Sequence, residues 1–573
     1  MSGVPSPVPG CSGERPTDSA LEVTPGVPAG VPPTAAAPSG PAAPKEPSVA
    51  RGGAAMASGS LASRILGVVR NSLIVALFAD SIPGNAWQVA TTLPTTVYTL
   101  LAGGMVNAVL VPQITRAARQ PDGGRDFIDR LLTVSFLGLL GITALSLPLA
   151  PAFVRIFSSP DWSPETFELS VQFTRVVLPA VFFYGLYAIL GQVLSARNRF
   201  GAYGWAPALA NVVWIVGLST YFVMYRGFGQ SVGDWTPPMI LLLGGSLTVG
   251  VALQALVLLI PLYRDGWRYR PRFGFRGVGL GTAGRVAGWT LAGIAVTQGA
   301  LALASQTLTS SQRGEVGRLG YDSAFFLFAT PHGLITVSLV TALFTVMSRS
   351  AARRDLVALR GQVRHGLRLL AVTTIPTTIA GVCLAKAGTA VVFPANTESV
   401  TTGIAWVFTI LVVALLPYGI LFLVQRTFYA FEDARTPFYL SLIAAVVFSA
   451  GSVASLLLAS PHRAYGVALA AGLSDVIAAW VGLRWIRGRL GGIRLLDVGD
   501  VATRTLFASL VGGLWTLAVV WVFQTVLPGR VGALLTLLVG GAVFVGVFLA
   551  GARWLKIGEI DEVIAPIARR LRR

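Results

Sequence analysis

Two arginines stand in an apolar stretch near the start of the hydrophobic part of the chain. Arg64 and Arg70 lie six residues apart, and most residues between and around them are apolar. Six helical residues span about 9 Å, so Arg70 lies well inside a membrane if Arg64 reaches the surface. Such a charge is costly unless it faces water, a partner or an anion, and a guanidinium can donate two parallel hydrogen bonds to a phosphate. Arg64, Arg70 and the neighbouring Asn71 are therefore candidate binding residues for an anionic group, with a structural ion pair as the alternative.

Polar side chains also form a stripe along two other apolar segments. In segment 85–115 they recur at helical spacing, at Gln88, Thr92, Thr95 and Thr99. In segment 279–309 the corresponding residues are Gln298, Ser305 and Thr309. Small polar residues often pack helices together within a membrane. They can equally line a cavity and bind a polar ligand such as a sugar, and the spacing fits both interpretations.

Four further charges and two prolines fall inside apolar segments. Arg175, Arg426, Asp322 and Asp475 could form a charge network, although the sequence assigns no pairs. Pro94 and Pro331 are predicted to kink their helices and to act as hinges, because proline removes a backbone hydrogen bond. The two cysteines and three histidines are scattered without metal-ligand spacing, so neither a metal ion nor another cofactor is expected.

The composition indicates what holds these residues. Of the 573 residues, 54% are apolar and 12% charged, with a mean hydropathy of +0.69. A soluble protein carries about twice this share of charge, so we predict an all-α, polytopic membrane protein. Fourteen stretches are long enough to cross a ~30 Å hydrocarbon core: 57–79, 85–115, 128–157, 166–196, 204–225, 237–262, 279–309, 317–348, 362–385, 399–431, 437–459, 465–485, 501–527 and 531–553.

The basic residues predict the orientation of these helices. With a cytoplasmic N-terminus, the loops on the other side contain only Arg155, Arg226, Arg313, Arg318, Lys386, Arg463 and Arg530. The remaining loops hold most of the 44 basic residues, as expected for cytoplasmic loops. Both termini are therefore expected in the cytoplasm. The net charge of +19 then reflects orientation and attraction to membrane lipids, and nucleic acid is not expected as a partner.

An internal repeat at an offset near 236 residues divides the chain. Pro94 corresponds to Pro331, and the Leu-Pro pair at residues 178–179 corresponds to that at 416–417. Six helices per repeat predict two lobes related by a pseudo-twofold axis along the membrane normal, with a cavity between them and two further helices. The predicted units are a disordered Pro/Ala-rich tail at 1–56, an N-lobe at 57–276, a C-lobe at 277–490, helices 13 and 14 at 491–553, and a basic cytoplasmic tail at 554–573.

These residues also resemble a known family. The run SRILGVVR at residues 63–70 is similar to the first-helix signature of the MurJ (MviN) family. Further matches are Leu93-Pro94, Val111-Pro112, LSARNRF at 194–200, Ala206-Pro207, LPYG at 416–419 and FYA at 428–430. The similarity runs in order over residues 57–553, and the arginine-, alanine- and glycine-rich composition resembles an actinobacterial-type member.

The resemblance implies a lipid II flippase with the fold of the multidrug/oligosaccharidyl-lipid/polysaccharide exporter superfamily. Such a protein is not an enzyme. It moves the undecaprenyl-pyrophosphate-linked peptidoglycan precursor across the bacterial plasma membrane by alternating access, for cell-wall synthesis. Arg64 and Arg70 would contact the pyrophosphate between the lobes. The implied partners are lipid II and membrane lipids. The N-terminal tail is expected to be a solvated cytoplasmic segment, with a contact for cell-wall or division proteins as the alternative.

The sequence departs from that family at several charged positions. Asn71 and Asn85 stand where acids are often found, and a basic position in the second helix falls near Tyr98 and Thr99. The Arg/Glu pair expected in helix 8 aligns with Phe326 and Ala329, and segment 437–459 lacks the acid of a sodium site. Three alternatives remain: an exporter of another polyprenyl-linked glycan or an amphipathic drug, a non-transporting membrane scaffold, and a membrane enzyme acting on polyprenyl lipids. The acids of the outside loops are too dispersed to favour the enzyme.

Overall fold

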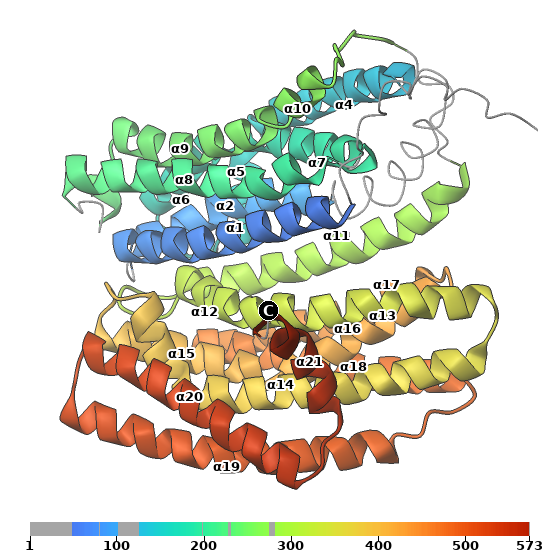
Figure 1. Cartoon of the computed structure of the whole chain (residues 1–573). Coiled ribbons are helices and arrows are strands. Elements are labelled where there is room, and N and C mark those ends of the chain that lie inside the picture. Colours follow the sequence, from blue (N-terminus) through green and yellow to red (C-terminus); the bar gives the residue numbers. More distant parts are fainter. Residues whose placement is uncertain are drawn as a thin grey trace, which may run out of the picture. The chain divides into compact units, whose positions relative to one another are not determined.

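We describe a computed structural model of the chain over residues 49–78, 81–100, 125–197, 199–226, 231–273 and 281–571. All regular secondary structure in these residues is helical, which confirms the predicted fold class (Figure 1). They contain twelve helical stretches long and apolar enough to cross a membrane, or thirteen if a bent pair is one span. Of the fourteen predicted segments, 85–115 is the one not among them, and its residues 101–115 lie outside the described part.

The first half of the chain begins with a helix that starts earlier than predicted. Its helices are α1 (Val49–Phe78), α2 (Ile82–Leu100), α4 (Arg125–Ser146), α5 (Ala150–Phe157), α6 (Pro164–Val177), α7 (Ala180–Ala196), α8 (Phe200–Tyr225), α9 (Pro237–Leu256) and α10 (Leu259–Arg264). Residues 49–56, predicted as the end of a disordered tail, belong to α1, where alanines favour the helix. Residues 1–48 lie outside the described part.

The second half ends with a helix where only a basic tail was predicted. Its helices are α11 (Gly281–Thr309), α12 (Arg318–Pro331), the π-helix η3 (His332–Thr336), α13 (Val337–Ala352), α14 (Leu356–Val392), α15 (Glu398–Val413), α16 (Leu415–Ala430), α17 (Arg435–Ala454), α18 (Arg463–Arg489), α19 (Leu496–Val526), α20 (Arg530–Trp554) and α21 (Glu559–Leu571). Helix α21 has an acidic first turn. Its Glu559 forms an ion pair with Arg368 of α14, and its Glu562 lies within hydrogen-bond distance of His365 Nε2, at 3.2 Å.

Proline accounts for the breaks in both halves. Helix α6 ends one residue before the pair Leu178-Pro179, and α15 and α16 meet at 45° just before Leu416-Pro417. A proline ring clashes with the carbonyl four residues earlier and lacks an N–H, so the helix ends there. Pro331 comes directly before the π-helical turn η3, whereas α2 continues through Pro94.

The same helix pairs pack together in the two halves. Helix α1 packs on α8 as α11 packs on α17, and α2 packs on α6 as α12 packs on α15. Likewise α7 packs on α9 as α16 packs on α18. Helices α19 and α20 pack on each other and on α14. The helix packing therefore repeats along the chain, as the spacing of the prolines predicted.

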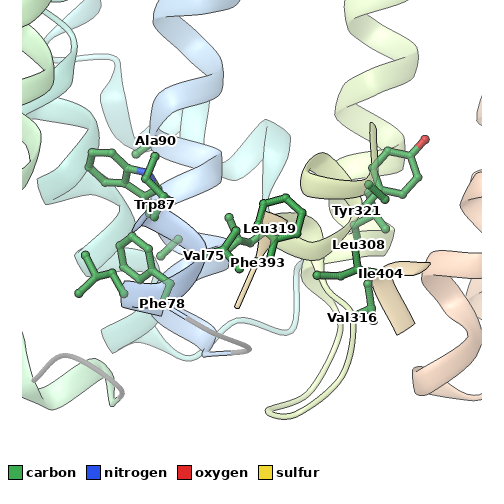
Figure 2. Close-up of a cluster of buried hydrophobic side chains, with 14 of the residues drawn as sticks. Val75, Phe78, Trp87, Ala90, Leu308, Val316, Leu319, Tyr321, Phe393 and Ile404 are labelled. Carbon is green, nitrogen blue, oxygen red and sulfur yellow. The ribbon is translucent and has the colours of Figure 1, made fainter. Parts of the chain in front are cut away.

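A buried apolar cluster contains side chains from both halves. It includes Phe78 and Trp87 of α1 and α2 together with Leu308 and Leu319 of α11 and α12 (Figure 2). Gly84 permits a close approach here, because a Cβ at this position would lie 3.0 Å from a methyl group of Leu319. The cluster joins the halves where α1 ends and α2 begins.

Candidate functional site

Polar contacts between the halves lie beside this apolar cluster. The Gln88 side-chain amide of α2 donates a hydrogen bond to Asp322 Oδ2 of α12 at 2.9 Å. The same carboxylate forms an ion pair with Arg318 Nε at 2.7 Å, one helical turn earlier. The Arg318 side chain is only 4% exposed, so Asp322 neutralises a buried cation while it accepts a hydrogen bond from the other half.

Asn85 reinforces the contact one turn before Gln88. Its Oδ1 accepts a hydrogen bond from the Leu319 backbone N–H, and its Nδ2 donates to Ser311 Oγ, each at 3.3 Å. A Cβ at Gly317 would lie 2.6 Å from the Asn85 amide, so the backbone before α12 needs glycine at this position. We call Asn85, Gln88, Arg318 and Asp322 the interlobe contact.

Helix α11 also binds the first half directly. Ser305 Oγ donates to the Phe157 carbonyl at 2.5 Å, and the Gln306 amide donates to the Ile156 carbonyl at 2.8 Å. Thr309 Oγ1 accepts from the Ser159 N–H at 2.8 Å. Ser305 is therefore buried in a helix contact.

Arg70 lines a cavity of about 260 Å³ enclosed by helices of the first half. Its guanidinium donates to Asn211 Oδ1 at 2.7 Å and lies 4.5 Å from the ring centre of Trp214. The Nε atom of Arg70 is buried without a hydrogen-bond partner, and no described carboxylate forms an ion pair with this residue. Tyr98 and Tyr184 line the same cavity. The arrangement presents a cation and hydroxyl groups inside the predicted membrane span.

Arg64 lies against the second half. Its guanidinium packs on η3, where a Cβ at Gly333 would come within 3.0 Å of Arg64 Nη1. Glycine at this position thus permits the arginine to approach the π-helical turn that follows Pro331. π-Helical turns are frequent at functional sites.

The two predicted polar stripes meet at one further cavity of about 250 Å³. Thr99 of α2 and Gln298 of α11 both line it, together with Trp289, Gln425 and Tyr429. Gln298 Nε2 also donates to Thr96 Oγ1 at 2.5 Å, which links α11 to α2. The remaining stripe residues are placed differently. Thr92 is buried and donates to the Gln88 carbonyl within α2, and exposed Thr95 donates to the Thr91 and Thr92 carbonyls.

The structure does not bring the four predicted network charges together. Asp322 pairs with Arg318, and Arg175 lies 4.0 Å from Glu168 on an exposed face of α6. The Arg426 guanidinium lies 4.9 Å from the Phe422 ring centre. Asp475 forms no ion pair with a described residue. Asn71 is partly buried, and its Nδ2 has no hydrogen-bond partner.

Sequence reasoning missed Arg318, Asn211 and Trp214 as site residues. Arg318 was assigned to an outside loop, although its spacing of four residues from Asp322 is that of a helical ion pair. Asn211 stands alone in an apolar helix, which was the available signal for a polar partner. Within the described residues, no three His, Cys, Asp or Glu side chains gather into a metal site.

Comparisons with known proteins agree with this architecture. A family model described as "Lipid II flippase MurJ" matches residues 74–540. The protein named "Probable lipid II flippase MurJ" from Synechocystis sp. is 25% identical over 88% of this chain and 94% of its own length. A relative of the same name from Rickettsia prowazekii is 22% identical over 76% of this chain and 82% of its own length.

Solved structures show the same fold at lower identity. A lipid II flippase MurJ in an inward closed conformation superposes with a TM-score of 0.68 at 18% identity, covering 87% of this chain and 99% of that one. An inward-facing MATE-family multidrug transporter of the MOP superfamily has a TM-score of 0.62 at 16% identity, covering 75% and 94%. Since the family model spans most of the chain, this multi-span membrane protein belongs to the lipid II flippase MurJ family.

Proposed function

We propose that this protein is a lipid II flippase of the bacterial inner membrane. It moves the polyprenyl-pyrophosphate-linked peptidoglycan precursor to the outer leaflet by alternating access, with both termini in the cytoplasm. Family membership supports the activity, and the distribution of arginines supports the orientation. The N-terminal tail is the proposed contact for cell-wall or division proteins.

The observation that carries the proposal is the environment of Arg70. It is a cation inside a membrane span, on the wall of a cavity, without a carboxylate partner among the described residues. An anionic group in the cavity would neutralise this charge and accept hydrogen bonds from the guanidinium, which a pyrophosphate does well. Arg64 is the second cation, and Asn71, Tyr98 and Thr99 supply hydrogen-bonding groups nearby along α1 and α2.

In this function, the interlobe contact acts as a gate that holds the two halves together at one end of the protein. Gln88 lies six residues from the start of α2, about 9 Å along the helix, and Phe78 and Leu319 belong to the apolar cluster beside it. Arg64 lies fourteen residues before the end of α1, about 21 Å from that same end. In the proposed orientation, the contact closes the extracytoplasmic side and Arg64 lies deeper in the membrane. Bending next to Pro331 and Pro94 would accompany the opposite state.

Lipid II accessibility tests the proposal. Depleting the protein in cells should leave lipid II out of reach of an externally added lipid II-cleaving enzyme, and restoring the wild-type protein should return it. Arg70→Ala should fail to restore accessibility at normal protein levels. Arg70→Lys should restore it in part, because it keeps the charge but loses the planar pair of donors.

Arg175→Ala is the matched control. It also removes an arginine from a membrane helix of the first half, but from an exposed face where Glu168 lies 4.0 Å from the guanidinium. Normal accessibility after depletion would refute the flippase assignment. Full activity of Arg70→Ala would refute the role of this arginine and favour a non-transporting scaffold.

The likeness to MATE-family structures supports a second candidate, an exporter of another polyprenyl-linked glycan or of amphipathic drugs. Growth rescue separates the two candidates. A flippase sustains growth of cells that lack their own lipid II flippase. An exporter of other compounds leaves them unable to grow.

A further inference from the structure

An open groove lies where α14, α18 and α19 meet, away from the cavities described above. It has a volume of about 1320 Å³ and continues into a second hollow of about 600 Å³ along α18. The two hollows share Arg487, Gly491, Gly492 and Leu495. We call this continuous feature the α18–α19 groove.

Three arginines of this groove have no partner among the described residues. Arg484, Arg487 and Arg494 are exposed, and none of them forms an ion pair, a side-chain hydrogen bond or a ring contact. They stand at the C-terminal end of α18 and in the turn before α19, which is the level of a membrane surface if α18 spans the bilayer. The groove thus has uncompensated positive charge at its mouth.

The two acids that line the groove are already neutralised. Asp497 accepts a hydrogen bond from Arg364 at 3.0 Å, and Asp500 accepts one from Arg504 Nε at 3.0 Å. The remaining groove arginine, Arg360, donates to the Leu490 carbonyl at 3.0 Å. Arg360 keeps its positive charge, but its guanidinium is held by this carbonyl, so the three unpaired arginines are the groove cations that are free to turn toward a ligand.

The groove becomes apolar along α18. Trp480 is 63% exposed and Leu483 lies one turn closer to the arginines, while Leu496 at the start of α19 is 88% exposed. Trp side chains favour the boundary between headgroups and acyl chains. A ligand that fills the whole groove therefore needs an anionic end and an apolar end.

Glycines keep the floor of the groove open. Gly491 and Gly492 have φ angles of 67° and 103°, a left-handed backbone that favours glycine and turns the chain from α18 into α19. At Gly488, in the last turn of α18, an added Cβ would meet no atom within 4 Å. The space above these glycines is where a lipid glycerol group would fit.

We propose that the α18–α19 groove binds one anionic phospholipid of the adjacent membrane leaflet. The phosphate contacts Arg484, Arg487 and Arg494, and an acyl chain runs along α18 past Leu483 and Trp480. A free phosphate would satisfy the arginines but leave the exposed apolar residues in water, so the groove fits a lipid better than a soluble anion. This site lies on different helices from the Arg70 cavity and does not depend on the proposed function.

Lipid binding to the purified full-length protein in a neutral detergent tests this site. Native mass spectrometry should detect bound phosphatidylglycerol in preference to phosphatidylcholine. The variant R484Q/R487Q/R494Q should weaken phosphatidylglycerol binding at least tenfold. The matched control R264Q/R268Q/R349Q also removes three arginines without ion pairs among the described residues, but outside the groove, and should change binding less than twofold.

A second variant tests the shape of the groove without changing its charge. Gly488→Leu should fill the hollow and weaken phosphatidylglycerol binding at least tenfold, whereas Gly546→Leu, which also has open space, should not. Equal losses in the two triple variants would overturn the site in favour of general surface attraction. Unchanged binding by Gly488→Leu, or soluble glycerol phosphate binding as tightly as the lipid, would overturn it as well.

Discussion

Replacing Gln88 by alanine removes a hydrogen bond between the two halves and leaves the neighbouring ion pair intact. Gln88 donates to Asp322 across the two halves at 2.9 Å, while Arg318 pairs with Asp322 within α12 at 2.7 Å. In Gln88→Ala the carboxylate keeps its arginine, so no buried charge is left unpaired. The substitution therefore weakens only the attraction between the halves, and the fold of each half is unaffected.

The magnitude follows from the nature of this bond. A hydrogen bond to a charged acceptor contributes about 1.5 to 3 kcal/mol. The Asp322 side chain is 24% exposed, so water replaces part of the lost bond and the lower end, about 1.5 kcal/mol, applies. The ratio of closed to open molecules at this end should then fall about tenfold. Asn85 and the apolar cluster still hold the closed state in part.

Distances between spin labels measure this ratio. Asp161 and Thr397 are exposed positions that follow α5 and precede α15, one in each half. With both native cysteines replaced and these two positions changed to cysteine for labelling, Gln88→Ala should increase the long-distance population in double electron–electron resonance. The wild-type background should show a dominant short distance.

Gln172→Ala is the control, since Gln172 also donates to a carboxylate, that of Glu168, but within α6. It should give the wild-type distance distribution. A Gln88→Ala distribution identical to that of the wild type would refute the idea that the interlobe contact keeps this end closed. An equal shift in both variants would attribute the effect to the loss of any glutamine.

Three further predictions follow from individual contacts. Ser305→Ala removes a buried hydrogen bond to the Phe157 carbonyl and should lower the stability of the protein by about 1 to 2 kcal/mol, visible as a lower unfolding temperature in detergent; an unchanged temperature would contradict this. Gly333→Leu should displace Arg64 and abolish most lipid II transport, whereas Gly299→Leu, which has open space, should retain it; equal activity of the two variants would remove the role of the Arg64 contact. Arg368→Gln breaks the ion pair with the largely buried Glu559 and should make α21 more accessible to protease, and wild-type cleavage rates would show that this pair does not hold the helix.

Much of the architecture could be predicted because membrane physics restricts it strongly. Apolar length fixes most of the helices, and the Leu-Pro pairs mark the breaks at Leu178 and Leu416. Neither the η3 turn after Pro331 nor helix α21 could be predicted from apolar length or from Leu-Pro pairs. The first depends on tertiary packing, and the second is short, with both acids and arginines.

The candidate site was predictable in residue type but not in partners. Arg64 and Arg70 were identified from the cost of a charge in lipid. The environments of the two arginines depend on the rotation of their helix, which the pattern of a single sequence does not reveal. In the structure, Arg70 lies within the first half, against Asn211, and Arg64 lies beside Gly333. The ion pair of Asp322 with Arg318 was hidden because Arg318 was counted among the basic residues of the outside loops.

The bonds from α11 to the end of α5 have a consequence for how the protein is made. During synthesis the first half enters the membrane before α11 exists, so the Ile156 and Phe157 carbonyls and the Ser159 N–H then lack their native partners. Buried backbone groups are unfavourable without a hydrogen-bond partner, and α11 supplies the partners of these three. The first half therefore enters the membrane with these hydrogen bonds unmade, and insertion of α11 couples the start of the second half to the completion of the first.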